Sequence, residues 1–209
     1  MTLTCTPDDA AALDRILRWR RDVRHFRREP IAPETIARLE AAMDLAPSVG
    51  NARPWRVIRI DDPGLRATVR TNFEAARTAA AQTYPTEQQA DYDRLKLAGL
   101  DAAPLQLAVF TVVDPAAGHG LGRQTMPGTV HDSTAMAIYT LWLAARAENI
   151  GLGMVSILDP AAIERLLAVP PGWAFAAWLC LGYPQFDDDT PLLHREGWQE
   201  NTAHRWDRR

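Results

Sequence analysis

A chain of 209 residues, 47% of them hydrophobic, can bury a substantial core and fits one large domain better than two independent ones. Its formal net charge of −3 and isoelectric point near 5.9 give no basic face for a nucleic acid, so any phosphate must be met by a local cluster of arginines. No apolar run approaches the roughly 20 residues that span a bilayer, and no export signal is evident. Cys5 and Cys180 lie far apart, which predicts no disulfide framework and a cytoplasmic location.

The first two predicted elements are helices. Thr6 supplies a capping hydroxyl before a proline and two acids, and Leu13, Ile16 and Leu17 then recur at helical spacing until the chain reaches a run of arginines. A second helix is predicted from residue 33, and it must stop near residue 47 because a proline disfavours a helical residue before it.

The rest of the chain alternates strands with helices. Hydrophobic patterns predict strands at 55–60, 105–113, 154–158 and 174–181, and helices at 65–100 with a break near Pro85, at 130–149 and at 160–169. The helix at 130–149 is apolar on several faces, which indicates a core or subunit contact, and Gly151 and Gly153 are expected to stop it. Four tryptophans in apolar patterns are expected in the core: Trp19, Trp142, Trp173 and Trp178.

This order of elements, without an internal repeat, predicts an α+β fold. We expect a single domain over residues 1–209. Within it, the helical insert at about 65–100 is a candidate lid, and a tail at about 184–209, with an acidic run at 187–189, is a candidate arm around a partner subunit.

A cluster of arginines follows the first predicted helix. Arg18, Arg20, Arg21 and Arg24 place several forked guanidiniums together, and such groups can bind a phosphate bidentately. The alternative is a cationic helix end that the helix dipole favours and water solvates, with Asp22 as an ion-pair partner inside the run.

Three segments resemble those of a known family. Residues 20–24 (Arg-Arg-Asp-Val-Arg) are similar to the amino-terminal flavin motif of nitroreductases, with Asp22 in place of the usual serine. Residues 46–50 (Ala-Pro-Ser-Val-Gly) and 151–158 (Gly-Leu-Gly-Met-Val-Ser-Ile-Leu) also resemble family segments and stand in the family's order. The chain thus resembles the nitroreductase superfamily and, within it, the 5,6-dimethylbenzimidazole synthases of the BluB type.

The resemblance implies a nitroreductase-like fold, with a central mixed sheet flanked by helices, in an intertwined homodimer that binds FMN at the subunit interface. The flavin contacts that it implies are Arg20, Arg21, Asp22, Val23, Arg24, Ser48, Leu105 and Ser156. Asp22 and Ser156 match the two positions that the family links to catalysis. A carboxylate beside a flavin can move protons, and the flanking arginines are expected to lower the pKa of Asp22 and favour a base.

The reaction that the resemblance implies consumes reduced FMN and dioxygen. It releases 5,6-dimethylbenzimidazole, the lower ligand of cobalamin, together with erythrose 4-phosphate. A separate flavin reductase is expected to supply the reduced FMN, because the loop with Gly118, Gly120 and Gly122 lacks the fingerprint of a dinucleotide site. No metal is assigned, since the five histidines show no paired ligand spacing.

Two other functions stay open at this point. One is an FMN-retaining, NAD(P)H-dependent nitroreductase or reductive dehalogenase. Asp22 argues against this function, because the flavin motif of nitroreductases usually has serine at this position. The other is a non-catalytic flavin-binding carrier or sensor. Asp22 can also be a purely structural ion-pair partner, and Ser156 an ordinary strand residue that satisfies a backbone group.

Overall fold

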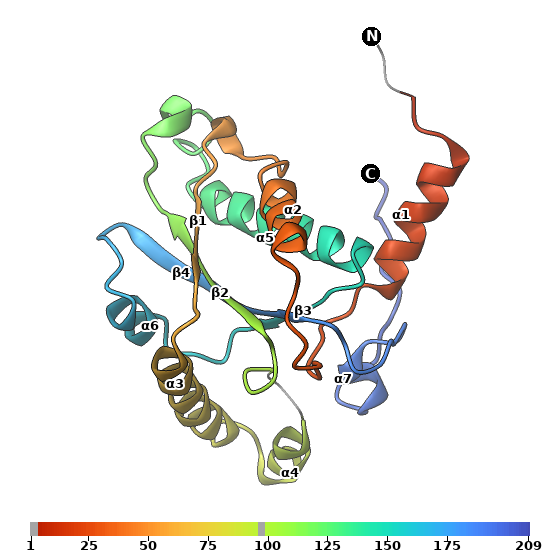
Figure 1. Cartoon of the computed structure of the whole chain (residues 1–209), viewed down its shortest axis with the longest axis vertical. Helices are drawn as coiled ribbons and strands as arrows, with labels where there is room; N and C mark the ends of the chain where they lie inside the picture. Colours follow the sequence, from red (N-terminus) through yellow and green to blue (C-terminus); the bar gives the residue numbers. More distant parts are fainter. Residues whose placement is uncertain (1–3, 96–98) are drawn as a thin grey trace.

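The computed structural model describes residues 4–95 and 99–209 and has an α+β architecture around one sheet (Figure 1). The strands lie in the order β1-β2-β4-β3. Their bounds are Trp55–Arg59 for β1, Leu105–Val112 for β2, Gly151–Val155 for β3 and Trp173–Gly182 for β4. All four strands overlap the ranges that the sequence predicts, since each is a short apolar or β-branched run between turn residues.

The expected mixed sheet is wrong, because all three pairings between neighbouring strands of this sheet are antiparallel. A helix between two strands often returns the chain to a parallel neighbour. Here α5 (Thr129–Ala147) does connect two strands that run in the same direction, β2 and β3. However, β4 lies between them and pairs antiparallel with both. The pattern of elements along a sequence indicates strand directions but not the lateral order of the strands.

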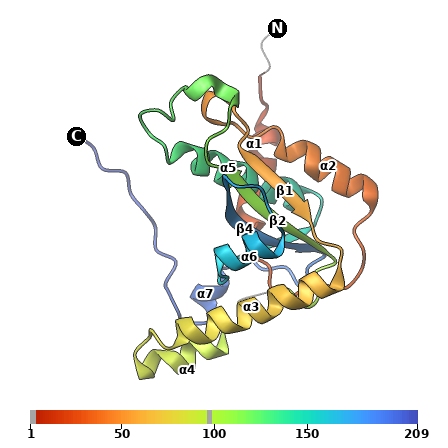
Figure 2. The ribbon, with the colours of Figure 1, turned by 90° about the vertical axis from the view of Figure 1, so that its left-hand side faces the viewer.

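The other helices pack on the two faces of this sheet or beside it (Figures 1 and 2). Their bounds are Pro7–Trp19 for α1, Pro33–Met43 for α2, Pro63–Ala81 for α3, Thr86–Arg94 for α4, Pro160–Leu166 for α6 and Leu192–Arg195 for α7. Thr6 caps α1 as predicted, in a reciprocal capping box with Asp9. The predicted break near Pro85 is confirmed, because Pro85 stands between α3 and α4 as the N-cap of α4.

Two hydrophobic clusters hold these layers together. On one face, α2 and α5 pack against the sheet through residues that include Leu39, Met43, Leu141, Leu152 and Leu179. On the other face, α3 and α6 pack through residues that include Val69, Phe73, Phe110, Ile163 and Trp178. Because its small and branched residues contact both α2 and the sheet, α5 is buried on more than one side, as its sequence indicates.

The end of α5 and the start of β3 differ from the prediction. The helix ends before Asn149, which takes a left-handed conformation with φ of 58°, and Gly151 and Gly153 then belong to β3 rather than to a helix stop. Ser156, expected inside this strand, lies just beyond its end.

The edge of β3 is covered by residues 20–24, called here the arginine segment. Val23 donates its N–H to the Leu152 carbonyl at 3.0 Å, and Asp22 forms a parallel bridge with Leu152. A side chain at position 153 would put its Cβ 2.1 Å from the Val23 carbonyl oxygen. Only glycine therefore lets the arginine segment approach the strand this closely.

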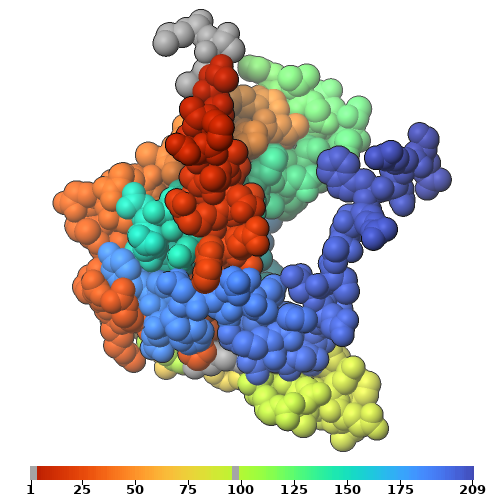
Figure 3. Space-filling model, turned by 90° about the vertical axis from the view of Figure 1, so that its right-hand side faces the viewer, coloured from red at the N-terminus to blue at the C-terminus, as the bar shows by residue number. Residues whose placement is uncertain are grey.

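Residues 184–209 leave the sheet and include the short helix α7. Trp198 contacts Tyr84 and Tyr92, with ring centroids 5.4 Å and 6.1 Å apart, and so ties this arm to α4. The last residues form no helix or strand and stand away from the body of the molecule (Figure 3). Movement of α3 and α4 as a lid, and wrapping of the arm around a partner, stay predictions. In the described part of the chain, no helix is both long and apolar enough to cross a membrane.

We expect Gly153→Ala to lower the free energy of unfolding by about 1–3 kcal/mol, because the added methyl group must displace the backbone of Val23. The matched control is Gly128→Ala, where the Cβ would meet nothing within 4 Å. Urea denaturation of both variants measures the difference, and equal stabilities would contradict the close approach of the arginine segment to β3.

Candidate functional site

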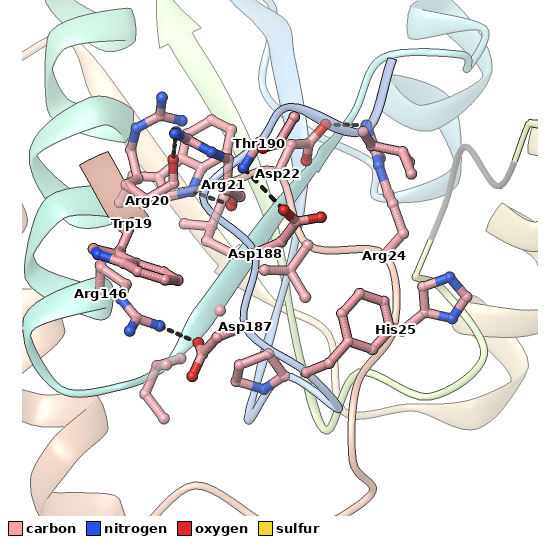
Figure 4. A pocket seen from close by; sticks show the side chains of 18 of the residues that line it. Trp19, Arg20, Arg21, Asp22, Arg24, His25, Arg146, Asp187, Asp188 and Thr190 are labelled. Carbon is pink, nitrogen blue, oxygen red and sulfur yellow. Dashed lines mark hydrogen bonds and ion pairs between the residues drawn. The ribbon is translucent and has the colours of Figure 1, made fainter. Parts of the chain in front are cut away.

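A pocket lies where the arginine segment, the carboxyl end of α5 and the arm meet (Figure 4). It holds about 600 Å³ of empty space, including its mouth toward solvent. All five residues of the arginine segment line it. The lining residues that contribute further charges or aromatic rings are Trp19, His25, Trp142, Arg146, Phe186, Asp187, Asp188 and Arg195.

Three interactions hold Asp22 and Arg24 against the end of β3. Its Oδ1 accepts the Met154 N–H at 3.0 Å, and its Oδ2 pairs with the Arg24 guanidinium. Arg24 in turn donates from Nη1 to the Met154 carbonyl at 3.2 Å. Asp22 and Arg24 therefore bind both polar groups of one residue, Met154, which fixes the carboxyl group at the pocket wall.

The arginines lower the pKa of Asp22 as expected, but burial outweighs them, so the expected net lowering of this pKa is wrong. Burial raises this pKa above the ordinary 3.8, although Arg24 first, then the Met154 N–H and Arg20, act in the opposite direction. The side chain still keeps 38% of its surface exposed, on the side of the pocket. The carboxyl group is thus able to exchange protons there and holds its proton to a higher pH than a solvated aspartate.

Arg20 and Arg21 present unused donors. The Nε atoms of both side chains are buried without a hydrogen-bond partner among the described residues. Leaving such a donor unsatisfied costs about 1–3 kcal/mol, and two neighbouring cases on guanidiniums indicate a ligand with several oxygen acceptors. Burial, and then the charge of Arg20, lower the pKa of Arg21, an effect that a bound anion would oppose.

The acidic run of the arm pairs with other arginines and contacts Arg21 through a backbone carbonyl. Asp187 pairs with Arg146 at 2.8 Å, Asp188 pairs with Arg195, and the Asp189 carbonyl accepts a hydrogen bond from Arg21. The sequence pattern showed the acidic run but not the arginine that it pairs with, because an ion pair between residues 41 positions apart has no periodic signal.

The four tryptophans expected in the core are buried to different degrees. Trp19, at the end of α1, is 37% exposed, so its prediction is wrong. Trp142 and Trp173 are half-buried and pack against the two core clusters, and Trp142 also lines the pocket. Trp178 does lie in the core and is fully buried. Apolar spacing on a helix predicts which face is covered, but not whether a core or a pocket covers it.

The other predicted flavin contacts, Ser48, Leu105 and Ser156, are absent from the described residues that line this pocket. Ser48 lies in the turn before β1, where its Oγ accepts the Arg53 N–H at 3.0 Å. Leu105 is 3% exposed and packs in the core beneath α2. Ser156 is exposed two residues beyond Met154, so it follows the same end of β3 that binds Asp22. The flavin roles of these three residues stay predictions.

Residues 17–183 match the model of the nitroreductase family. The chain belongs to the nitroreductase family. It is 69% identical to a 5,6-dimethylbenzimidazole synthase of Rhodobacter capsulatus, over 95% of this chain and 96% of that protein. It is 52% identical to one of Rhodospirillum rubrum, over 95% of this chain and 94% of that protein. The solved structure of oxidised iodotyrosine deiodinase, bound to FMN and 3-iodo-L-tyrosine, is similar in fold, with a TM-score of 0.73, 21% identity and coverage of 94% of this chain and 97% of that one.

The raised pKa of Asp22 has a consequence for stability. The folded state keeps a proton on Asp22 at pH values where the unfolded state has lost it, so the contribution of Asp22 to folding declines as pH rises from below 3.8 through the folded pKa. We therefore expect the free energy of unfolding of the wild type to fall relative to that of Asp22→Asn over this range. Urea denaturation at a series of pH values measures it. A difference that moves the other way would mean that Arg24 outweighs burial.

Proposed function

We propose that this chain is a 5,6-dimethylbenzimidazole synthase that consumes reduced FMN and dioxygen and releases 5,6-dimethylbenzimidazole and erythrose 4-phosphate. The observation that carries the proposal is identity of 69% and 52%, over nearly the full length, to two proteins of that name. Asp22 supports it as well, because nitroreductases usually have serine at this position of the motif and the pocket holds the Asp22 carboxyl at its wall.

The pocket has the groups that the phosphate of FMN requires. Arg20 and Arg21 offer buried Nε donors without partners, and Arg24 adds a third guanidinium beside Asp22. A phosphate accepts several charge-assisted hydrogen bonds, and arginine matches its geometry bidentately. We assign the phosphate to Arg20 and Arg21, with Arg24 completing the cluster. The reduced flavin would supply both the electrons for dioxygen and the carbon skeleton of the product.

Asp22 is the group that we assign to proton transfer. Its carboxyl is fixed by the Met154 N–H and Arg24, and burial raises its pKa above that of a solvated aspartate, which favours a role as a proton donor. Ser156 follows Met154 at the same end of β3, and its hydroxyl can donate and accept a hydrogen bond. In this assignment Asp22 moves protons and Ser156 assists from the strand end.

A second copy of the chain and a flavin reductase are the proposed partners. Ser48 is tied to α5 through Val49, whose N–H donates to Ser133 Oγ at 3.0 Å, whereas the pocket begins at Trp142. Nine residues of helix, about 14 Å, separate these points, so a flavin contact from Ser48 is best supplied by a partner copy. Exposed apolar side chains that a second copy would cover are Leu13 and Leu17 of α1, Met136 and Tyr139 of α5, and Met154 of β3.

The direct test reduces FMN photochemically under nitrogen with the purified protein, admits air, and measures the small molecules by mass spectrometry. We expect 5,6-dimethylbenzimidazole from the wild type and a yield at least about 100-fold lower from Asp22→Asn, since a positioned acid or base contributes about 10²–10⁴ in rate. The matched control is Asp61→Asn, which alters an exposed ion pair with Arg59 and should leave the yield unchanged.

Quantitative recovery of FMN from the wild type would overturn the proposal. Steady consumption of NAD(P)H with a nitroaromatic would then assign the chain to the FMN-retaining nitroreductases or dehalogenases, and tight binding of FMN without turnover would assign it to flavin carriers or sensors. A normal yield from Asp22→Asn would leave the activity in place and remove Asp22 from the chemistry.

A further inference from the structure

Trp142 is placed at the pocket wall by α5. It stands one turn after Tyr139 and one turn before Arg146, and all three side chains face the end of α1 and the arginine segment. Figure 4 shows Arg20 and Arg21 beside this helix, with Arg24 on the far side of the pocket. Its half-buried indole packs against the core cluster of α2 and α5 and also lines the pocket.

The indole contacts two consecutive arginines in two different ways. Its Nε1–H donates to the Arg21 carbonyl oxygen at 3.2 Å. Its ring face lies against the Arg20 guanidinium, with 5.0 Å between the guanidinium carbon and the ring centroid. Tyr139 adds a second ring, 5.6 Å from the same carbon. One side chain thus holds the backbone of Arg21 by its edge and the cation of Arg20 by its face.

This double contact restricts how the arginines can move. Stacking on an aromatic face leaves the in-plane N–H groups of a guanidinium directed outward, and the Nε of Arg20 remains without a partner among the described residues. A guanidinium that is already ordered loses less conformational entropy when it binds an anion. The hydrogen bond to Arg21 likewise fixes the peptide that leads into Asp22.

We infer that Trp142 is a positioning residue for the flavin phosphate. It orders the phosphate site by stacking on Arg20 and by holding the Arg21 carbonyl. The inference rests on the proposed function in one respect, because it takes the phosphate of FMN as the ligand of these arginines. An indole that only fills space would need neither an aligned N–H nor a guanidinium over its face.

The experiment compares the binding of oxidised FMN and of riboflavin, which lacks the phosphate, by equilibrium dialysis. Trp142→Phe keeps a ring face but removes the N–H donor, and we expect about fivefold weaker FMN binding. Trp142→Leu also removes the ring, and we expect a loss of about thirtyfold. Riboflavin affinity should change less than about twofold in both variants, because the arginines act on the phosphate. Trp173→Phe is the matched control, since Trp173 also has an arginine, Arg56, over its ring but lies outside the pocket.

A double-mutant cycle with Arg20→Ala separates positioning from packing. We expect the effect of Trp142→Leu on FMN binding to shrink to about the fivefold that the N–H donor contributes, because the stacked cation is gone. Equal losses for FMN and riboflavin, or an undiminished effect without Arg20, would overturn the inference. The binding experiment uses oxidised flavin and needs no turnover. A wild type that binds FMN but forms no 5,6-dimethylbenzimidazole would therefore refute the proposed function, whereas the binding constants of the variants would still decide the role of Trp142.

Discussion

Val23 donates its N–H to Leu152 across the outer edge of β3, and Gly153 leaves the space that the Val23 carbonyl needs beside the strand. An edge strand has unpaired backbone groups, and here the chain's own arginine segment covers them. Because residues 20–24 are fixed along the edge of β3, their side chains have defined positions. The pocket, the carboxyl group at its wall and the guanidiniums around it all depend on this pairing.

That pairing also explains why the charged side chains of residues 20–24 lie in two different environments. Asp22 is drawn against the Met154 peptide together with Arg24, so its carboxyl loses water on one side and its pKa rises despite the cations. Arg20 and Arg21 point elsewhere, toward Trp142 and the acidic arm. The segment thus separates a proton-exchanging group from an anion-binding group, and a molecule with a phosphate at one end and a reactive ring at the other matches this separation.

Sequence reasoning located the elements and the arginine segment, because capping residues, apolar periods and clustered guanidiniums are local signals. It failed for features that depend on contacts between residues far apart in the sequence. Strand order depends on which edges meet, the pKa of Asp22 depends on how much water the fold excludes, and the pairing of the acidic run with Arg146 depends on where the arm returns. Trp142 packs against the core cluster as expected, but its pattern does not show that it also contacts Arg20 and Arg21.

The measurement that tests the central claim most directly is a pH titration of bound FMN followed by ³¹P NMR. A free phosphate monoester has a second pKa of about 6, and neighbouring guanidiniums favour the dianion. If Arg20 and Arg21 hold the phosphate, bound FMN will stay dianionic at pH values where free FMN has taken up a proton. A bound phosphate that titrates like free FMN would contradict the account, because it would lie in water and away from the arginine segment.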